Sequence, residues 1–274
     1  MSYSYSVVVP AYNASNTVLR SLASIEAQSL SPIEVIIVDD ASQDNTAALV
    51  ESHIPRMREA GIALRCIQLT RNSGPSVARN LGLQEASGDF VAFLDADDVW
   101  EVDKLAIVEH AIGESDAALV CHSYSEPGSS ASDFHKSLGI KRLSLRQMLW
   151  CNPAQTSCAI VRRNIGVKFD ESMRYCEDYD LWLRIAENSS VLIIVGRPLT
   201  KLGRPQLTMG GLSGSTLRMR AGELRVYCKF CSRQWLARGW LLPFLVVYSV
   251  LKHLRSTLRR WITQTNNWSN FKKS

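Results

Sequence analysis

The sequence predicts an α/β fold with three layers, in which helices cover both faces of a mostly parallel sheet. Strand and helix patterns alternate over roughly the first 125 residues, as in βαβ units. Two of the predicted strands end in clusters of acids, at Asp39-Asp40 and at Asp95-Ala96-Asp97-Asp98. Because ligands of such sheets bind at the carboxyl ends of the strands, we expect both clusters in one site.

The predicted strands are short runs rich in β-branched and aromatic residues. The first run ends at a proline, and the second and fourth pass directly into acids. The others are apolar runs that stand between helical patterns or, for the last, precede the final helix. In chain order the predicted strands are residues 5–10, 34–39, 63–69, 90–94, 117–122 and 155–162.

The predicted helices carry apolar residues three and four positions apart. In the first of them, Val18, Leu22 and Ile25 follow the possible cap Ser15. The third begins with a proline, which a first turn tolerates, whereas Pro55 is expected to bend or interrupt the second. In chain order the predicted helices are residues 17–27, 46–60, 75–85, 102–112 and 178–187.

Length and composition are those of an ordinary globular protein. The chain has 274 residues, 46% hydrophobic and 21% charged, enough for one large domain or one domain with an appendage. Its seven cysteines follow no disulfide framework and no signal-peptide pattern opens the sequence, so we expect a reducing cytoplasm. Cys228 and Cys231 form a single CxxC pair, which by itself does not indicate a metal or redox site.

The net charge of +5 conceals a division at Glu223, the last acidic residue. All 26 acids lie at or before it, while ten of the 31 lysines and arginines follow it. We therefore predict a mildly acidic catalytic domain over residues 1–223 and a basic, tryptophan-rich helical tail over residues 224–274.

The acidic strand ends indicate a particular chemistry. Three acids within the four residues 95–98 repel one another unless a cation lies between them. The second cluster, Asp39-Asp40, repeats the pattern at the end of another strand. The two clusters together predict a site for a divalent metal and a phosphorylated ligand.

Five motifs follow one another over residues 5–200. They are Val7-Val8-Val9-Pro10-Ala11-Tyr12-Asn13, Val38-Asp39-Asp40-Ala41-Ser42-Gln43-Asp44-Asn45-Thr46, Asn72-Ser73-Gly74-Pro75-Ser76-Val77-Ala78-Arg79-Asn80, Phe93-Leu94-Asp95-Ala96-Asp97-Asp98 and Glu177-Asp178-Tyr179-Asp180-Leu181-Trp182. In this order they resemble the motifs of family 2 glycosyltransferases. The resemblance implies the Rossmann-like GT-A fold, a nucleotide-sugar donor, a divalent cation (Mn²⁺ or Mg²⁺), and transfer with inversion at the anomeric carbon.

The resemblance also implies how the donor is held. The end of the first strand, Pro10-Ala11-Tyr12, corresponds to the segment that lies against the nucleotide base. Asp40 corresponds to the acid that accepts a hydrogen bond from the base, typically uracil, with Asp39 as the alternative. Arg79 is expected either to approach the nucleotide and its phosphates or to form a salt bridge with nearby acids.

For the metal, the resemblance implies roles for the acids of the fourth motif. Asp97 corresponds to the carboxylate that binds the ion, and Asp95 to the one that faces the ribose or a metal-bound water. Asp98 is expected to contact these two acids without binding the ion itself. A divalent ion in this position neutralises the charge that develops on the leaving diphosphate.

Glu177-Asp178 stands at the start of the last predicted helix, where acids have an ordinary role in capping free N–H groups. The resemblance implies instead that Asp178 is the base that takes the proton from the acceptor hydroxyl, with Glu177 as a helper or acceptor contact. Trp150 is a candidate for stacking on a sugar, although a core position is the default for tryptophan.

The tail combines apolar and basic residues. As a helix, the apolar run 240–251 spans about 18 Å, too short for the roughly 30 Å core of a bilayer. Beyond it, Leu251, Leu254, Leu258, Trp261 and Ile262 share one helical face, with basic residues toward the other. This predicts a helix lying in an anionic membrane interface, with a helix pair packed on the catalytic domain as the alternative. The long apolar run argues against nucleic acid as a partner.

The sequence thus leads to a metal-dependent, inverting glycosyltransferase, a hexosyltransferase bound to the inner face of the cell membrane. Its expected donor is a nucleotide sugar, of the UDP type. Its expected acceptor is a lipid-linked saccharide, on polyprenyl diphosphate, in bacterial surface polysaccharide biosynthesis. Two alternatives stay open: a sugar nucleotidyltransferase, whose usual Gly-rich basic loop is missing after the first strand, and a phosphoreceiver-like signalling module, which is about half this length.

Overall fold

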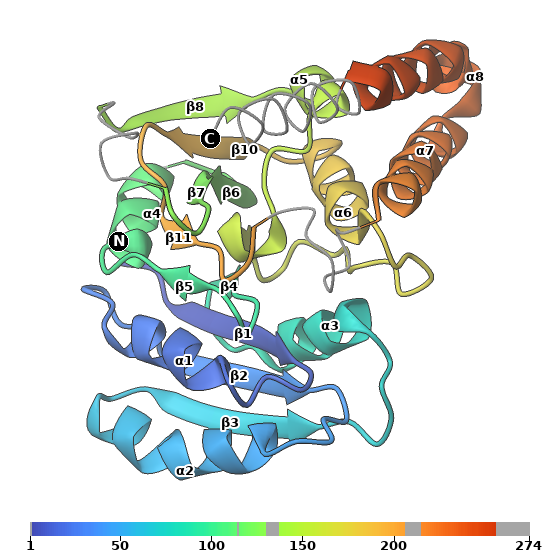
Figure 1. The fold of residues 1–274 in the computed structure, drawn as a ribbon. Helices are drawn as coiled ribbons and strands as arrows, with labels where there is room; N and C mark the ends of the chain where they lie inside the picture. The colour runs from blue at the N-terminus through green and yellow to red at the C-terminus, as the bar shows by residue number, and fades with distance from the viewer. Residues whose placement is uncertain (1, 114, 130–136, 206–214, 256–274) are drawn as a thin grey trace, which may run out of the picture.

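The structure is a computed structural model that describes residues 2–113, 115–129, 137–205 and 215–255. A central sheet of eight strands carries helices on both faces, so the predicted three-layer α/β fold is confirmed (Figure 1). The apolar tail residues Leu258, Trp261 and Ile262 lie outside the described residues.

The main sheet places the two acidic strand ends on either side of β1. Its strands are β1 (Tyr5–Ala11), β2 (Glu34–Asp39), β3 (Ala63–Gln68), β4 (Phe90–Phe93), β6 (Leu119–His122), β8 (Gly139–Leu143), β9 (Ala159–Arg162) and β10 (Val191–Val195). They lie in the order β3-β2-β1-β4-β9-β6-β10-β8. β3, β2, β1 and β4 are parallel, as are β6 and β10, whereas β9 and β8 are antiparallel to their neighbours.

The helices form the outer two layers. They are α1 (Val18–Glu26), α2 (Thr46–Glu59), α3 (Pro75–Glu85), α4 (Lys104–Ile112), α5 (Leu145–Trp150), α6 (Glu177–Ala186), α7 (Thr216–Arg233) and α8 (Trp235–Arg238), with 3₁₀ turns η2 (Thr156–Cys158) and η4 (Gly239–Leu241). Alternate residues of β1 face the two cores, as the two-residue period of a strand requires. Val7 and Val9 belong to the core that includes residues of α1, α2 and α4, and Val8 belongs to the core that includes residues of α3, α5, α6 and α7.

A second, three-stranded sheet holds a late segment against the acidic turn. Its strands are β5 (Val99–Trp100), β7 (Tyr124–Ser125) and β11 (Thr200–Lys201), in the order β5-β11-β7. β11 pairs with β5, which directly follows the acids at 95–98. Residues 202–204 therefore lie beside those acids, although about a hundred residues separate the two segments in the chain.

Pro55 was expected to bend or interrupt α2, and the structure excludes the interruption. The helix continues to Glu59, and Val50 and Met57, on either side of the proline, are fully buried. Burial of both halves against the sheet therefore offsets the hydrogen bond that the proline cannot donate. The strand predicted over 155–162 also differs at its start, where η2 precedes β9.

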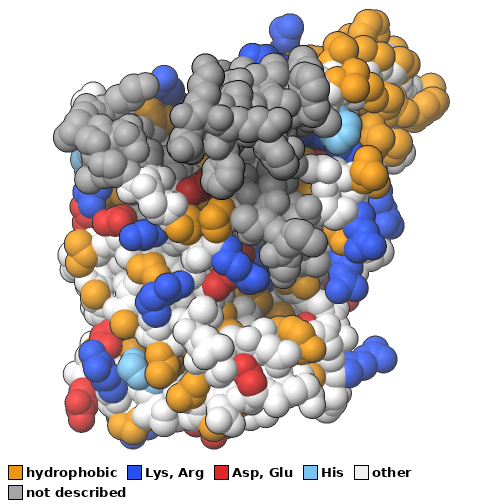
Figure 2. All heavy atoms as spheres, viewed as in Figure 1, with side chains coloured by type: hydrophobic (Ala, Val, Ile, Leu, Met, Phe, Trp, Pro, Cys, Tyr) orange, Lys and Arg blue, Asp and Glu red, His pale blue; other side chains and the backbone are white. Residues whose placement is uncertain are grey.

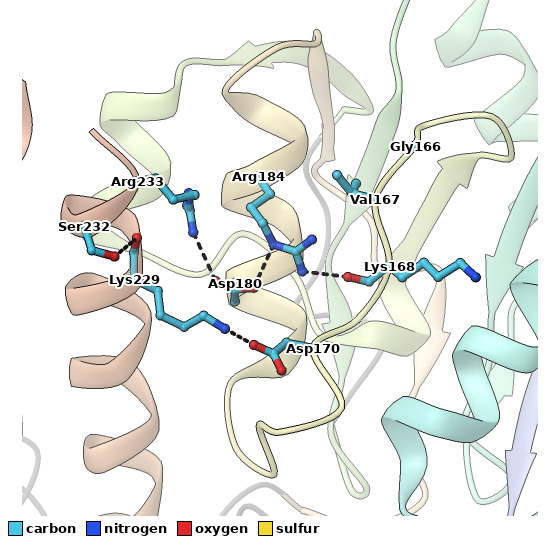
Figure 3. Close-up of a pocket in the computed structure, with 9 residues that line it drawn as sticks. All are labelled: Gly166, Val167, Lys168, Asp170, Asp180, Arg184, Lys229, Ser232 and Arg233. Carbon is cyan, nitrogen blue, oxygen red and sulfur yellow. Dashed lines mark hydrogen bonds and ion pairs between the residues drawn. The ribbon is translucent and has the colours of Figure 1, made fainter. Parts of the chain in front are cut away.

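α7 crosses the predicted boundary after Glu223 without a break. Beyond that point its buried residues join the core that contains α6; they are Val226, Tyr227, Phe230 and Cys231. Ion pairs join the surfaces of the two helices around a hollow of about 520 Å³ (Figure 3). There Lys229 pairs with Asp170, and Arg233 approaches the fully buried Asp180 to 3.4 Å. The change in composition at residue 223 therefore falls inside one continuous, well-packed helix.

After α8 and η4, residues 242–255 form a helix with two unlike faces. Leu245 and Ser249 are buried against the catalytic domain, and the Tyr248 hydroxyl donates to the Trp150 carbonyl oxygen at 2.7 Å. The opposite face is an exposed apolar stripe made of Phe244, Val247, Val250, Leu251 and Leu254. Figure 2 shows hydrophobic side chains gathered where this helix lies in Figure 1. The tail therefore packs on the catalytic domain with one face and leaves the other uncovered by the described residues.

The helical tail is longer than its apolar core. The segment Trp235–Arg255 has 21 residues and contains an 18-residue window with a mean hydropathy of 1.2, of which 11% is buried. By length and composition this helix could cross a membrane. The argument from sequence that residues 240–251 are too short to do so therefore does not apply to the longer helix. A single such helix is weak evidence for a membrane span. Its hydrogen bonds to Trp150 and Glu223 favour a helix that lies along the surface of the protein.

Candidate active site

A cleft of about 1040 Å³ opens at the carboxyl ends of β1, β2 and β4, where an α/β sheet binds its ligands. Every predicted site residue lines it: Pro10, Ala11, Tyr12, Asp40, Arg79, Asp95, Asp97, Glu177 and Asp178. The sheet topology explains this convergence for the first half of the site, because β1 lies between the strands that end in Asp40 and Asp95. The second half is brought in by the start of α6.

Asp40 ties the end of β2 to the loop before α3. Its two carboxylate oxygens accept the backbone N–H groups of Ser73 at 2.6 Å and Gly74 at 2.7 Å. Each oxygen has a second lone pair, so Asp40 can still accept a bond from a nucleotide base. Both acids are buried, but Asp40 lines the cleft, whereas Asp39 does not and accepts the backbone N–H of Ser42 at 3.2 Å.

The turns that follow β1 and β2 have unusual backbone conformations. Asn13 and Ala41 have φ angles of 49° and 60°, in the left-handed region that residues with a Cβ seldom adopt. The strand-end segment between β1 and Asn13 includes Tyr12, whose side chain is 50% exposed at the mouth of the cleft. Such strain is concentrated where loops position functional groups.

Arginines balance the negative charge of the acidic turn at residues 95–98. Arg79 pairs with Asp95 at 2.8 Å and Arg204 with Asp97 at 2.7 Å. Asp98 is 5% exposed and accepts the N–H of Gly203 at 2.9 Å, and burial together with the neighbouring Asp95 raises the pKa of Asp98 to about 7. Within the described residues, no three His, Cys, Asp or Glu side chains are grouped to hold a metal by themselves. Asp95 and Asp97 carry hard oxygen ligands of the kind that Mn²⁺ and Mg²⁺ prefer.

Three residues that the sequence did not single out support this turn. Ser157, in η2, accepts the N–H of Asp95 on its hydroxyl at 2.9 Å, while its carbonyl oxygen accepts a bond from the Lys104 ammonium at 2.9 Å. Lys104 is fully buried 3.7 Å above the Trp100 ring centroid, and burial lowers the pKa of its ammonium to about 7. Gly203 lies so close that an added Cβ would come within 1.9 Å of the Asp97 carbonyl oxygen.

Arg79 joins the two halves of the cleft. It is 5% exposed, and its guanidinium pairs with Asp95 on one side and with Glu177, at 3.0 Å, on the other. These carboxylates raise the pKa of Arg79 against the opposing effect of burial. The salt-bridge alternative for Arg79 is thus the arrangement that the structure contains, and it fixes the acidic turn at a set distance from α6.

Asp178 stands in the first turn of α6 with features of both sequence alternatives. One oxygen accepts the N–H of Tyr179 at 2.7 Å, which is a local helix-start bond, and the other lies 3.4 Å from the Asn152 amide. Burial and the adjacent Glu177 raise the pKa of Asp178 to about 7. The preceding residue, Cys176, has a φ of 59° and makes no capping bond with its side chain. A carboxyl with this pKa can exchange a proton near neutral pH.

The cleft extends to the tail, which sequence reasoning did not anticipate. Glu223 of α7 is 5% exposed and lines the cleft together with Arg220 and Lys252. It accepts bonds from Lys252 at 2.9 Å, from Ser249 at 2.5 Å and from Arg220. Trp150 packs edge-to-face against Tyr248 with ring centroids 4.8 Å apart, so its ring contacts the tail helix.

Comparison with known proteins shows the family of the chain. Residues 6–166 match the family model described as "Glycosyl transferase family 2". The chain is 32% identical over 208 residues to the amylovoran biosynthesis glycosyltransferase AmsB of Erwinia amylovora, covering 72% of this chain and 68% of that protein. It is 28% identical over 255 residues to the UDP-Glc:alpha-D-GlcNAc-diphosphoundecaprenol beta-1,3-glucosyltransferase WfgD of Escherichia coli, covering 92% and 95%.

Among solved structures, residues 1–349 of S. aureus TarS in complex with UDP-GlcNAc superpose with a TM-score of 0.65 at 22% identity. The superposition covers 83% of this chain and 66% of that one, just under two thirds of the TarS chain. At this identity the likeness shows the fold alone, which is GT-A. With its family model, its relatives and its fold in agreement, the chain belongs to glycosyl transferase family 2 and is a glycosyltransferase.

Proposed function

We propose that the protein transfers a sugar, with inversion, from a UDP-sugar to a hydroxyl of a lipid-linked glycan at a membrane surface. The observation that carries this proposal is a single cleft in which Arg79 links the acidic turn, through Asp95, to Glu177 beside Asp178. Displacement with inversion needs a leaving-group site and a base on opposite sides of the sugar, and this cleft supplies one candidate for each. Membership of the family decides against a nucleotidyltransferase or a phosphoreceiver module.

For the donor, we assign the base to Pro10-Ala11-Tyr12 and Asp40, and the diphosphate to the acidic turn. Asp97 and Asp95 would hold Mn²⁺ or Mg²⁺ together with the diphosphate, since neither carboxylate is buried beyond reach of the cleft. The ion would supply positive charge to the leaving nucleoside diphosphate. Arg204, which pairs with Asp97 in this structure, stands beside the same group.

For the chemical step, we assign the base to Asp178. The acceptor hydroxyl oxygen forms a bond to the anomeric carbon, the bond from that carbon to the diphosphate breaks, and the hydroxyl proton passes to the Asp178 carboxylate. A pKa of about 7 makes this carboxylate a better proton acceptor than an ordinary aspartate with a pKa of 3.8, while leaving much of it ionised at neutral pH. Asn152, 3.4 Å away, and the N–H of Tyr179 orient it.

For the acceptor, the tail and a relative point the same way. The name of WfgD states an acceptor on diphosphoundecaprenol, and its similarity covers 92% of this chain. The exposed apolar stripe of the tail lies on a helix that also reaches the cleft through Lys252. Apolar residues next to basic ones favour attachment to an anionic membrane surface, which we place on the cytoplasmic side. Related proteins act in the synthesis of bacterial polysaccharides, including amylovoran and, as a putative assignment in its name, teichuronic acid.

The decisive experiment is a panel of nucleotide sugars tested by thermal shift with Mn²⁺, with Mg²⁺ and with EDTA. We expect a UDP-sugar to raise the melting temperature only when a divalent ion is present. Asp97→Asn should abolish this metal-dependent shift, while Asp116→Asn, at an exposed acid away from the cleft, should leave it unchanged. A shift that is equally large in EDTA would contradict the metal, and a shift with GDP- or dTDP-sugars alone would contradict the donor.

A further inference from the structure

The cleft has two ends of opposite charge. Six carboxylates, from Asp40 through the acidic turn to Glu177-Asp178, line the donor end with two arginines. The side of the cleft formed by α7 and the tail helix supplies Arg220 and Lys252 with the single carboxylate of Glu223, and Arg174 lines the same cleft. An acidic end attracts a phosphorylated ligand through a metal, whereas a basic end attracts one directly. The second end is therefore built for a different anion.

Glu223 holds two of these cations side by side. Its buried carboxylate accepts Lys252 at 2.9 Å on one oxygen and Arg220 on the other, and these partners lower the pKa of Glu223. An ammonium has three N–H donors and a guanidinium five, and Glu223 takes one from each. The side chains of Arg220 and Lys252 are 23% and 36% exposed, so they remain open to the cleft. The remaining donors suit a ligand with two adjacent anionic groups.

Lys252 also sits where the cleft meets the apolar surface. It belongs to the helix of residues 242–255, whose other face is the exposed apolar stripe. A ligand bound at Arg220 and Lys252 could therefore extend a sugar toward Asp178 and an apolar chain toward the stripe. A lipid diphosphate sugar has these three parts in this order.

We propose that Arg220 and Lys252 bind the diphosphate of the lipid-linked acceptor without a metal ion. The inference rests on the proposed function, which names the acceptor class, and adds the residues that recognise it. Lys252 comes from the tail, so the tail contributes a binding residue to the site. Glu223 is a positioning residue, because it reaches the ligand only through the two cations.

The test measures binding of farnesyl diphosphate, a short lipid diphosphate, by titration calorimetry in EDTA. We expect the double variant Arg220→Gln/Lys252→Gln to weaken binding by about tenfold or more, since each lost contact is a charge-assisted hydrogen bond. The control Arg225→Gln/Arg255→Gln removes the same charge from the same two helices, at Arg225, which binds Ser172, and at the exposed Arg255. It should bind as the wild type does. Arg220→Lys keeps the positive charge and should keep most of the affinity. If it does, the loss in the double variant is due to the missing charges.

The outcomes are distinct. Equal losses in both double variants would mean attraction to net charge and would overturn the site, and so would equal binding of uncharged farnesol. Inorganic diphosphate that binds as tightly as the farnesyl compound would overturn the lipid source. The proposed function is tested separately in the same samples by the shift that a UDP-sugar produces with Mn²⁺. That shift should survive in Arg220→Gln/Lys252→Gln, and its absence from the wild type would refute the donor proposal while leaving the diphosphate site to stand on its own binding data.

Discussion

The raised pKa of Asp178 predicts an unusual dependence of the transfer rate on pH. Burial and Glu177 raise this pKa from the ordinary 3.8 to about 7. The base must be ionised to accept a proton, so the rate at saturating donor should rise with pH through a midpoint near 7. At pH 6 about 9% of Asp178 would be ionised and at pH 8 about 91%, which makes the rate roughly tenfold higher at pH 8. An aspartate with a pKa of 3.8 would give a flat profile over this range.

Two variants separate this cause from others. Asp178→Asn should lower the rate by a factor of about 10² to 10⁴ and remove the rising limb. Glu177→Gln removes the adjacent negative charge that raises the pKa of Asp178, so the midpoint should move to lower pH. The assay is release of nucleoside diphosphate from the donor, measured with acceptor from pH 5.5 to 8.5. A flat wild-type profile, or a midpoint that moves to higher pH in Glu177→Gln, would refute the assignment.

Folding stability provides an independent check on the same group. A carboxyl whose pKa is higher in the folded than in the unfolded chain binds its proton more tightly when folded. Its contribution to stability is therefore greatest below the unfolded value of 3.8 and is lost as the pH rises toward 7. Asp178→Asn carries no such charge, so at pH 8 it should melt no lower than the wild type. A variant that is inactive because it has unfolded would melt at a lower temperature. The melting temperature therefore distinguishes loss of the catalytic base from loss of folding.

Three further predictions concern the acidic turn and the tail. Asp97→Asn should weaken binding of Mn²⁺ with the donor at least tenfold, as followed by titration calorimetry, and unchanged binding would remove Asp97 from the metal site. Gly203→Ala should lower the free energy of unfolding by about 1–3 kcal/mol and impair donor binding, because its Cβ would lie 1.9 Å from the Asp97 carbonyl oxygen. Gly139→Ala is the control, because there the nearest atom is a Val195 methyl at 3.3 Å. Val247→Glu/Leu251→Glu should abolish salt-sensitive cosedimentation with anionic vesicles and leave donor binding intact; undiminished cosedimentation would exclude the stripe as the membrane contact.

The donor half of the site could be predicted because local pattern and topology act together there. Residues 34–39 form β2 as expected, since the apolar run Val35–Val38 is fully buried in the sheet and the acids that follow it mark the strand end. The bounds predicted for α3 are also confirmed, because Pro75 begins the helix and a Ser-Gly-Asp turn follows it. In contrast, β5, β7 and β11 have two residues each, and no periodic pattern exists over two residues.

The supporting residues could not be predicted, because their roles depend on contacts between distant segments. Lys104 opens a helix with an apolar face, where a lysine is ordinarily solvated, and only the fold brings the Ser157 carbonyl and the Trp100 ring to its ammonium. Gly203 has no signal of its own, because its importance lies in the Asp97 backbone that β11 places against it. Arg79 was identified by its motif, but its partner Glu177 lies 98 residues away.

Of the two sequence alternatives for the tail, packing on the catalytic domain is observed on one face of the helix, and the opposite face is an exposed apolar stripe. An almost uniformly apolar run gives little contrast between faces, so its pattern could not reveal that Leu245 and Ser249 point inward while Val247 and Leu251 point outward. The inward face is fixed by Glu223, the residue at which the composition changes. Because no acid follows it in the sequence, the basic tail must find its carboxylate partners in the catalytic domain and α7, and Lys252 finds Glu223 at the cleft. The charge division therefore has a structural consequence: the ion pair of Lys252 with Glu223 helps to set which face of the tail packs on the enzyme, and hence which face is exposed.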